Sequence, residues 1–193
     1  MRKLDHDNRR AELAEAAAQL IAREGLDALS TRKLAIEMGC TIGVINHYFE
    51  RKEQLVIAAL NWANERIFER LQTALLEIAD LDNFGVILES ALPISQKSEM
   101  EWRVRLYTWG FALNNKEVLQ MQHKRAAYVS VTITTLMQNL QDVGQIRGDV
   151  DISRATQTLI DLVLGVGFEM LHLPKGKRLQ QAQNIRFYLK ALR

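Results

Sequence analysis

Apolar residues recur every three or four positions along most of this chain, a spacing that is typical of amphipathic α-helices. Only two prolines interrupt the pattern, and glycine is sparse. The predicted fold is therefore all-α, with about nine helices and a polar loop over residues 95–98. The helices are expected over residues 8–24, 32–38, 42–49, 51–79, 82–91, 99–113, 116–143, 152–171 and 178–193.

Residues 30–55 carry two short helical patterns and the start of a third, separated by turns. Ser30 and Thr31 can each cap the first helix, and Gly39 follows its last apolar residue, where helices commonly end in a left-handed residue. Thr41 can cap the second helix. Two short helices joined by a glycine-containing turn are typical of a helix-turn-helix that reads DNA.

The second short helix has two unlike faces. Ile45, Tyr48 and Phe49 fall on one face at helical spacing and predict a packed side. The opposite face carries small and polar residues, so it could approach the edges of bases closely. It is formed by Ile42, Gly43, Val44, Asn46 and His47.

The fourth predicted helix, residues 51–79, is too long to belong to a small head alone and should link the head to a body. Residues 1–52 are therefore expected to form a DNA-binding head of three helices. Residues 53–193 are expected to form a helical body that dimerises and binds a ligand.

The eighth predicted helix is apolar around most of its circumference, so it must be covered on all sides. One reading makes it the central core helix of a monomer. The favoured reading places the eighth and ninth helices against a second copy of the chain. The expected interface residues are Leu159, Val163, Gly167, Met170 and Phe187.

Composition sets broad limits on the protein class. The 193 residues are 48% hydrophobic and 25% charged, which is enough to bury a core in one or two domains. A formal net charge of +2 is below the level that by itself marks a nucleic-acid binder. The placement of charge says more, because Arg32-Lys33 and Arg51-Lys52 flank the second short helix. A single cysteine excludes an internal disulfide, and no segment resembles a membrane span or a signal peptide, so we expect a cytoplasmic protein without membrane contact.

The residues that enzymes need are not assembled in this sequence. His6, His47, His123 and His172 are scattered, with no partner at metal-ligand spacing, and there is no glycine-rich phosphate loop or nucleophile elbow. Cys40 is interpreted as a small apolar filler of the turn rather than a redox switch. We therefore expect no catalytic activity, no metal and no cofactor.

The spacing over residues 29–55 resembles the DNA-binding domain of the TetR family of transcriptional regulators. The matching residues, in the family's order, are Leu29, Ser30 or Thr31, Leu34-Ala35, Gly39, Thr41, Ile45, Tyr48-Phe49, Lys52-Glu53 and Leu55. The resemblance implies that Thr41, Tyr48 and Lys52 contact phosphates and that Arg32 reaches a base. The remaining residues of the expected DNA-binding set are Ile42, Gly43, Val44, Asn46 and His47.

The body more loosely resembles the C-terminal domain of BetI-type repressors, which respond to choline. The residues that carry this resemblance lie over 101–106, 144–146 and 160–165. It implies a dimer and a small-molecule effector held in a pocket of the body. The aromatic and soft side chains expected to line the pocket are Trp62, Phe84, Trp102, Tyr107, Trp109, Phe111, Met121 and Phe168, although ordinary core packing is the alternative for most of them.

These patterns predict a sequence-specific, dimeric repressor that a small molecule releases from a palindromic operator of double-stranded DNA. A dimer is expected because one short helix in one groove buries too little surface for useful affinity. The alternative is a helical small-molecule-binding or interaction module that never touches DNA. The two differ in one property: only the regulator should bind duplex DNA with an affinity that falls steeply with salt.

Overall fold

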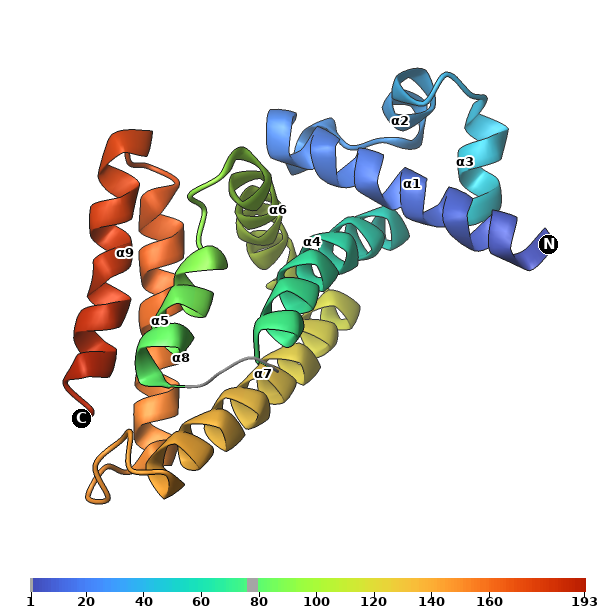
Figure 1. Cartoon of the computed structure of the whole chain (residues 1–193). Helices are drawn as coiled ribbons and strands as arrows, with labels where there is room; N and C mark the ends of the chain where they lie inside the picture. The colour runs from blue at the N-terminus through green and yellow to red at the C-terminus, as the bar shows by residue number, and fades with distance from the viewer. Residues whose placement is uncertain (1, 76–79) are drawn as a thin grey trace. The chain divides into compact units, whose positions relative to one another are not determined.

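The computed structural model describes the backbone of residues 2–75 and 80–193, and the side chains of residues 6–69 and 80–193. The described chain contains nine α-helices, one short 3-10 turn and no β-strand (Figure 1). None of these helices is both long and apolar enough to cross a membrane. The helices are α1 Arg2–Glu24, α2 Thr31–Glu37, α3 Ile42–Tyr48, α4 Lys52–Leu75, α5 Leu81–Ser90, α6 Gln96–Ala112, α7 Lys116–Asp142, α8 Ile152–Met170 and α9 Lys175–Lys190, with the 3-10 turn η1 at Leu26–Ala28.

The predicted all-α fold of nine helices is confirmed, and several helix boundaries differ from the expected ones. Helix α1 begins at Arg2 rather than at residue 8. The stretch 76–79, expected to end the fourth helix, lies outside the described residues. A second difference, at residues 95–98, has a clear physical cause.

The expected loop at residues 95–98 is wrong, because α6 begins at Gln96. The Ser98 backbone N–H donates to the Ser95 hydroxyl at 3.1 Å, and the Ser95 N–H donates to the Ser98 hydroxyl at 3.1 Å. This reciprocal pair satisfies N–H groups that the first turn of a helix leaves without partners. Polar residues that indicated a loop therefore form a helix start.

Helix α9 also starts earlier than its sequence suggests. The expected start was residue 178, yet α9 begins at Lys175 with Pro174 as the capping residue. Proline is tolerated at a helix start, because the N–H that it lacks has no partner within the helix there. The Lys177 N–H donates to the Pro174 carbonyl at 2.9 Å and closes the first turn.

The chain packs into two units. The first comprises the chain up to Ile67 together with Met100–Asn115, and the second comprises Phe68–Glu99 and Lys116–Arg193. The first unit therefore holds the expected head, residues 1–52, and in addition most of α4 and most of α6. The functional division at residue 52 stays a prediction.

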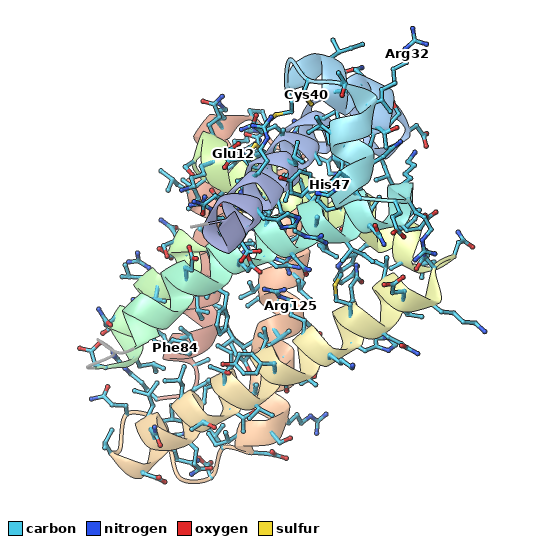
Figure 2. All side chains as sticks on the ribbon, turned by 90° about the vertical axis from the view of Figure 1, so that its right-hand side faces the viewer. Glu12, Arg32, Cys40, His47, Phe84 and Arg125 are labelled. Carbon is cyan, nitrogen blue, oxygen red and sulfur yellow. The ribbon has the colours of Figure 1, made fainter. Side chains whose placement is uncertain are left out.

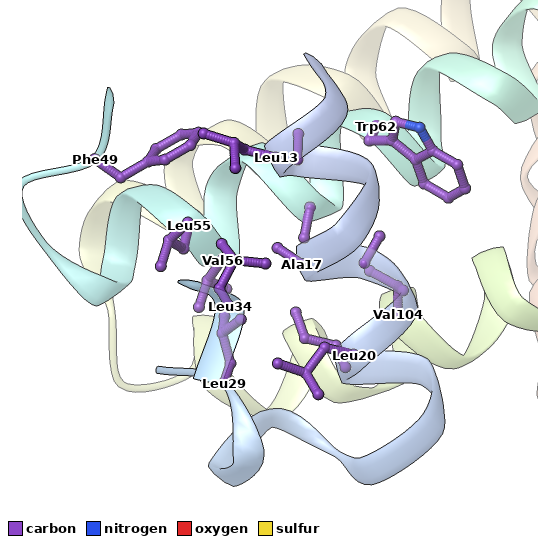
Figure 3. Close-up of a cluster of buried hydrophobic side chains, with 14 of the residues drawn as sticks. Leu13, Ala17, Leu20, Leu29, Leu34, Phe49, Leu55, Val56, Trp62 and Val104 are labelled. Carbon is purple, nitrogen blue, oxygen red and sulfur yellow. The ribbon is translucent and has the colours of Figure 1, made fainter. Parts of the chain in front are cut away.

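The first unit is built around one buried cluster to which α1, α2, α3, α4 and α6 all contribute (Figure 3). Leu13, Ala17 and Leu20 of α1 recur at helical spacing and are fully buried. Leu34 of α2 and Ile45 of α3 pack into the same cluster. Each short helix of the head therefore owes its position to the apolar side chains that it buries there.

The second unit packs α5 against α9, α7 against α8, and α8 against α9. Arg178, near the start of α9, is buried and accordingly has several partners. Its Nη1 donates to the Pro93 carbonyl at 2.9 Å and to the Glu99 carboxylate at 2.7 Å, and its Nε donates to the Leu173 carbonyl at 3.2 Å. These bonds join the start of α9 to Pro93, between α5 and α6, and to Glu99 in the first turn of α6.

Candidate DNA-binding site

Helix α2 and the turn that follows it are set by local hydrogen bonds. The Ser30 hydroxyl accepts from the Lys33 N–H at 3.1 Å and caps the helix start. Gly39 has φ +60°, a left-handed conformation that side-chain-bearing residues adopt at a cost. The Cys40 N–H then donates to the Ala35 carbonyl at 3.0 Å and closes the turn.

Helix α3 presents the two faces that its sequence predicts. The Thr41 hydroxyl accepts from the Val44 N–H at 3.4 Å at the helix start. Ile45 is fully buried, as is Phe49 directly after the helix. Ile42 on the opposite face is 44% exposed, although it is a large apolar residue. The packed side is thus turned into the head, and the other side faces solvent.

The residues expected to contact DNA come together on α2, α3 and the start of α4. Figure 2 shows the Arg32 side chain extending away from the head, with His47 on α3. Seven of the nine are exposed: Arg32, Thr41, Ile42, Gly43, Asn46, His47 and Lys52. Val44 and Tyr48 are half-buried, and Tyr48 packs against the edge of the core cluster. Their contacts with DNA stay predictions.

Helix α1 contacts the end of α3 through two residues that the sequence did not single out for this site. The Arg10 Nη1 donates to the Tyr48 carbonyl at 3.1 Å, and its guanidinium carbon lies 4.7 Å from the centre of the Phe49 ring. The His6 ring lies 4.6 Å from the Tyr48 ring and 5.8 Å from the His47 ring, centre to centre. These pairs are about forty positions apart in the chain, so no local spacing signals them.

A second polar connection joins the other end of α1 to α2. Arg23 donates to Glu37 at 2.6 Å and to Glu24 at 3.0 Å, and the Lys33 ammonium pairs with Glu24. Hydrogen bonds from Lys33 and Arg23 lower the pKa of the Glu24 carboxyl below its ordinary value. This contact is therefore fully present at neutral pH and is lost as the pH falls through the lowered pKa.

The eight residues expected to line an effector pocket are divided between the two units. Trp62, Trp102, Tyr107, Trp109 and Phe111 belong to the first unit, and Phe84, Met121 and Phe168 belong to the second. The rings of Trp62, Trp102 and Phe84 are buried, whereas Tyr107 and Trp109 are about 40% exposed. Tyr107 packs beside Gly25 at the end of α1, and Phe111 packs against the head core. The pocket stays a prediction.

Two of these tryptophans have a guanidinium of the same chain over the ring. The guanidinium carbon of Arg105 lies 4.5 Å from the ring centre of Trp102, and that of Arg66 lies 5.5 Å from that of Trp62. A bound cation could therefore use only the opposite faces of these rings.

The expected dimer residues differ in their exposure. Leu159, Gly167 and Met170 of α8 are buried within the single chain, so they do not present a surface to a second copy here. Val163 is half-buried, and Phe187 of α9 is 78% exposed. Leu179, two turns before Phe187 on α9, is 62% exposed and was not singled out in the sequence. Of these two helices, α9 therefore exposes large apolar side chains, whereas Leu159 and Met170 of α8 are buried.

The fold and this face define a helix-turn-helix protein with a helical body, and family comparisons agree. Residues 13–59 match the model of the bacterial regulatory proteins of the tetR family. Residues 69–193 match the model of the BetI-type transcriptional repressor C-terminal domain. The chain belongs to the TetR family of transcriptional regulators. It is a DNA-binding regulator of transcription, as the sequence predicted.

Individual relatives are distant. PksA of Bacillus subtilis is 25% identical over 123 residues, which cover 63% of this chain and 60% of PksA. UidR of Escherichia coli is 20% identical over 157 residues, which cover 81% of this chain and 79% of UidR. A transcriptional regulator from Saccharomonospora viridis, solved in complex with choline, has a TM-score of 0.85 at 23% identity and covers 95% of this chain and 96% of its own.

Two glycines of the head test its local geometry in opposite directions. Gly39→Ala should destabilise the head by about 1–2 kcal/mol, because alanine is strained at a positive φ although its Cβ would meet no atom. Gly43→Ala should stabilise the head by about 0.5–1 kcal/mol, because Gly43 is helical and the new Cβ makes only an ordinary contact with Thr41. Chemical denaturation of both variants measures the difference. Equal effects of the two changes would contradict the turn geometry.

Proposed function

We propose that this protein is a dimeric repressor that binds a palindromic operator through two copies of α3 and is released by a small molecule. The observation that carries the proposal is the exposed face of α3, with Arg32 and Lys52 exposed beside it. Ile42 on this face is apolar and 44% exposed, and it would suit contact with thymine methyl groups. As a regulator of transcription, the protein would act in the cytoplasm, where bacterial DNA lies.

Each residue of the face suits one kind of DNA contact. Thr41, Tyr48 and Lys52 would bind phosphates and set the register of the head on the duplex. Arg32 would pair with a guanine, whose two acceptors match the guanidinium fork. The α3 residues Gly43, Val44, Asn46 and His47 would meet the remaining base edges. Since phosphate contacts release counterions, the affinity would fall steeply with salt, unlike that of a module that does not bind DNA.

A second copy of the chain is proposed to cover the exposed side of α9. Leu179 and Phe187 are eight residues apart, a spacing that falls within one broad apolar stripe of a helix, and both are exposed. Half-buried Val163 on α8 would extend this apolar surface, because α8 packs against α9. Two-fold pairing would present two α3 helices to one pseudo-palindrome.

A small-molecule effector is supported by one unsatisfied group. The indole N–H of Trp62 is buried and has no hydrogen-bond partner in the described part of the chain. An unpaired buried donor is costly, and a ligand acceptor would satisfy it. The match to the BetI-type C-terminal model and the choline bound in the similar structure make a quaternary ammonium compound the first ligand to test. The ligand would release DNA by favouring one conformation of the body.

The DNA contacts are tested with a duplex selected by the wild-type protein from a random library. Arg32→Ala should weaken binding to this duplex by about 1–3 kcal/mol and relax the preference at one base pair. Arg154→Ala on α8 removes the same charge from an exposed site outside the head and should leave the preference unchanged. Equal losses on selected and scrambled duplexes would show that Arg32 contacts only the backbone.

The interface is tested by placing a charge on α9. Phe187→Glu should convert the dimer to a 22.1 kDa monomer in analytical ultracentrifugation, because a buried unpaired carboxylate opposes association. Leu113→Glu is the matched control, since Leu113 is 79% exposed at the end of α6 and should tolerate the same change. A Phe187→Glu protein that stays dimeric would place the interface elsewhere.

The effector site is tested by titrating choline into the complex with the selected duplex. Trp62→Phe keeps a six-membered aromatic ring and removes the N–H donor together with the five-membered ring that carries it. We expect choline to release wild-type protein from DNA, and the variant to need about tenfold more choline, the value of one lost hydrogen bond in a buried site. Tyr128→Phe is the control: it removes a hydrogen-bond donor from a ring that is 53% exposed and outside the expected pocket, so choline should release this variant as it does the wild type. If the choline concentration that releases the wild type also releases the Trp62 variant, the indole is not part of the effector site.

A further inference from the structure

Helix α3 is held at three places, and only two of them could be foreseen. The Thr41 hydroxyl caps its start, and Ile45 anchors its middle in the core. The third is at its end, where Figure 1 shows α3 reaching the N-terminal part of α1. There the Arg10 guanidinium donates to the Tyr48 carbonyl and lies over the Phe49 ring.

The end of α3 needs such a contact because the helix has only seven residues. The last carbonyl groups of a helix have no partner within it, and short helices are marginal in water. The Phe49 N–H still donates to the Ile45 carbonyl at 2.9 Å, but the backbone then leaves the helix. A cation bonded to the Tyr48 carbonyl satisfies one terminal group and is favoured by the helix dipole.

The side chains at this end of α3 are held as well. The His6 ring packs against Tyr48 at 4.6 Å with the planes tilted by 36°, and against His47 at 5.8 Å nearly edge-on. His47 and Tyr48 contact each other at 5.2 Å. His6 and Arg10 are one helical turn apart on α1, so they act from the same side of that helix.

We propose that the N-terminal part of α1 holds the end of α3 in the position that DNA recognition requires. Arg10 and His6 are positioning residues: they fix the last turn of α3, and with it the aim of His47 and Tyr48, without reading a base themselves. The inference rests on the proposed role of α3 in DNA recognition. It makes specificity depend on two residues outside the helix-turn-helix motif.

A direct contact of Arg10 with phosphate is the competing explanation, and the charge-conserving variant separates the two. Arg10→Lys keeps the positive charge but loses the planar group that lies over Phe49 while bonding the Tyr48 carbonyl. A positioning role predicts that lysine at position 10 does not restore the affinity for the selected duplex. A phosphate contact predicts that lysine does restore this affinity. It also predicts that Arg10→Ala lowers the slope of log affinity against log salt concentration by about one.

The experiment measures the affinities of wild-type, Arg10→Lys and Arg10→Ala proteins for the selected and scrambled duplexes over a range of salt. We expect the affinity of both variants for the selected duplex to fall about tenfold. A loss of this size corresponds to one charge-assisted hydrogen bond. We expect Arg10→Lys to keep wild-type affinity for the scrambled duplex. Arg9→Lys is the matched control: Arg9 pairs with Glu12 at 2.7 Å and should bind as wild type. Full rescue by lysine would overturn the role of Arg10.

His6 is tested by a conservative pair in the same assay. His6→Phe keeps a ring against Tyr48 and should retain specificity, whereas His6→Ala should lose it. Loss in both would instead indicate that the imidazole itself contacts DNA, which overturns the positioning role of His6.

Two further readouts distinguish an error in the positioning role of α1 from an error in the proposed DNA-binding site. NMR spectra of the free proteins should show shifted ring signals of His47 and Tyr48 in Arg10→Lys, without any DNA present. Unchanged spectra would contradict the positioning role of Arg10 even if the variant binds DNA poorly. If Arg32→Ala binds the selected duplex as tightly as wild type, the proposed DNA-binding site is wrong. If Arg32→Ala binds this duplex weakly while Arg10→Lys binds it with wild-type affinity, only the positioning role of α1 is wrong.

Discussion

The burial of one side of α3 is the constraint on which the rest of this head depends. A helix of seven residues has little stability of its own, so its position comes from the apolar groups that it buries. Ile45 and, just beyond the helix, Phe49 are fully buried in the cluster built by α1, α2 and α4. The same packing turns the opposite side outward. Stability and recognition are therefore served by different residues of one short helix.

This division explains why a nearly neutral chain can be a DNA-binding protein. The formal net charge of +2 gives little general attraction for DNA. What the head offers instead is placement: Arg32 and Lys52 are exposed beside α3, while Lys33 and Arg23 are engaged with acidic residues of the head itself. Some of the basic residues thus hold the helices in position, and others remain available to an external partner.

Local pattern predicted most of the fold and the two faces of α3. Caps, the turn at Gly39 and the buried side of α3 depend on residues within a few positions of one another, so their spacing carries the information. The contact between Arg10 and Tyr48 joins residues 38 positions apart and follows only from how α1 packs against α3. The start of α6 was missed because serines can form a loop or cap a helix, and the choice depends on reciprocal hydrogen bonds.

Residue type alone was least informative in the body. An apolar circumference on α8 indicated a dimer interface, yet Leu159 and Met170 are buried by the chain's own helices, whereas Leu179 and Phe187 on α9 are exposed. Aromatic residues indicated a cage for a cation, yet Trp62 and Trp102 already have guanidinium groups over their rings. Side chains suited to a ligand or to a second copy are equally suited to core packing, and only the three-dimensional arrangement distinguishes these roles.

The central claim is that the solvent-facing side of α3 meets the bases of a duplex. The most direct measurement is NMR chemical-shift mapping of the full-length protein as the selected duplex is added. The account predicts the largest changes at Ile42, Asn46 and His47, with little change at buried Ile45. Changes that cluster on another helix while α3 is unaffected would contradict it.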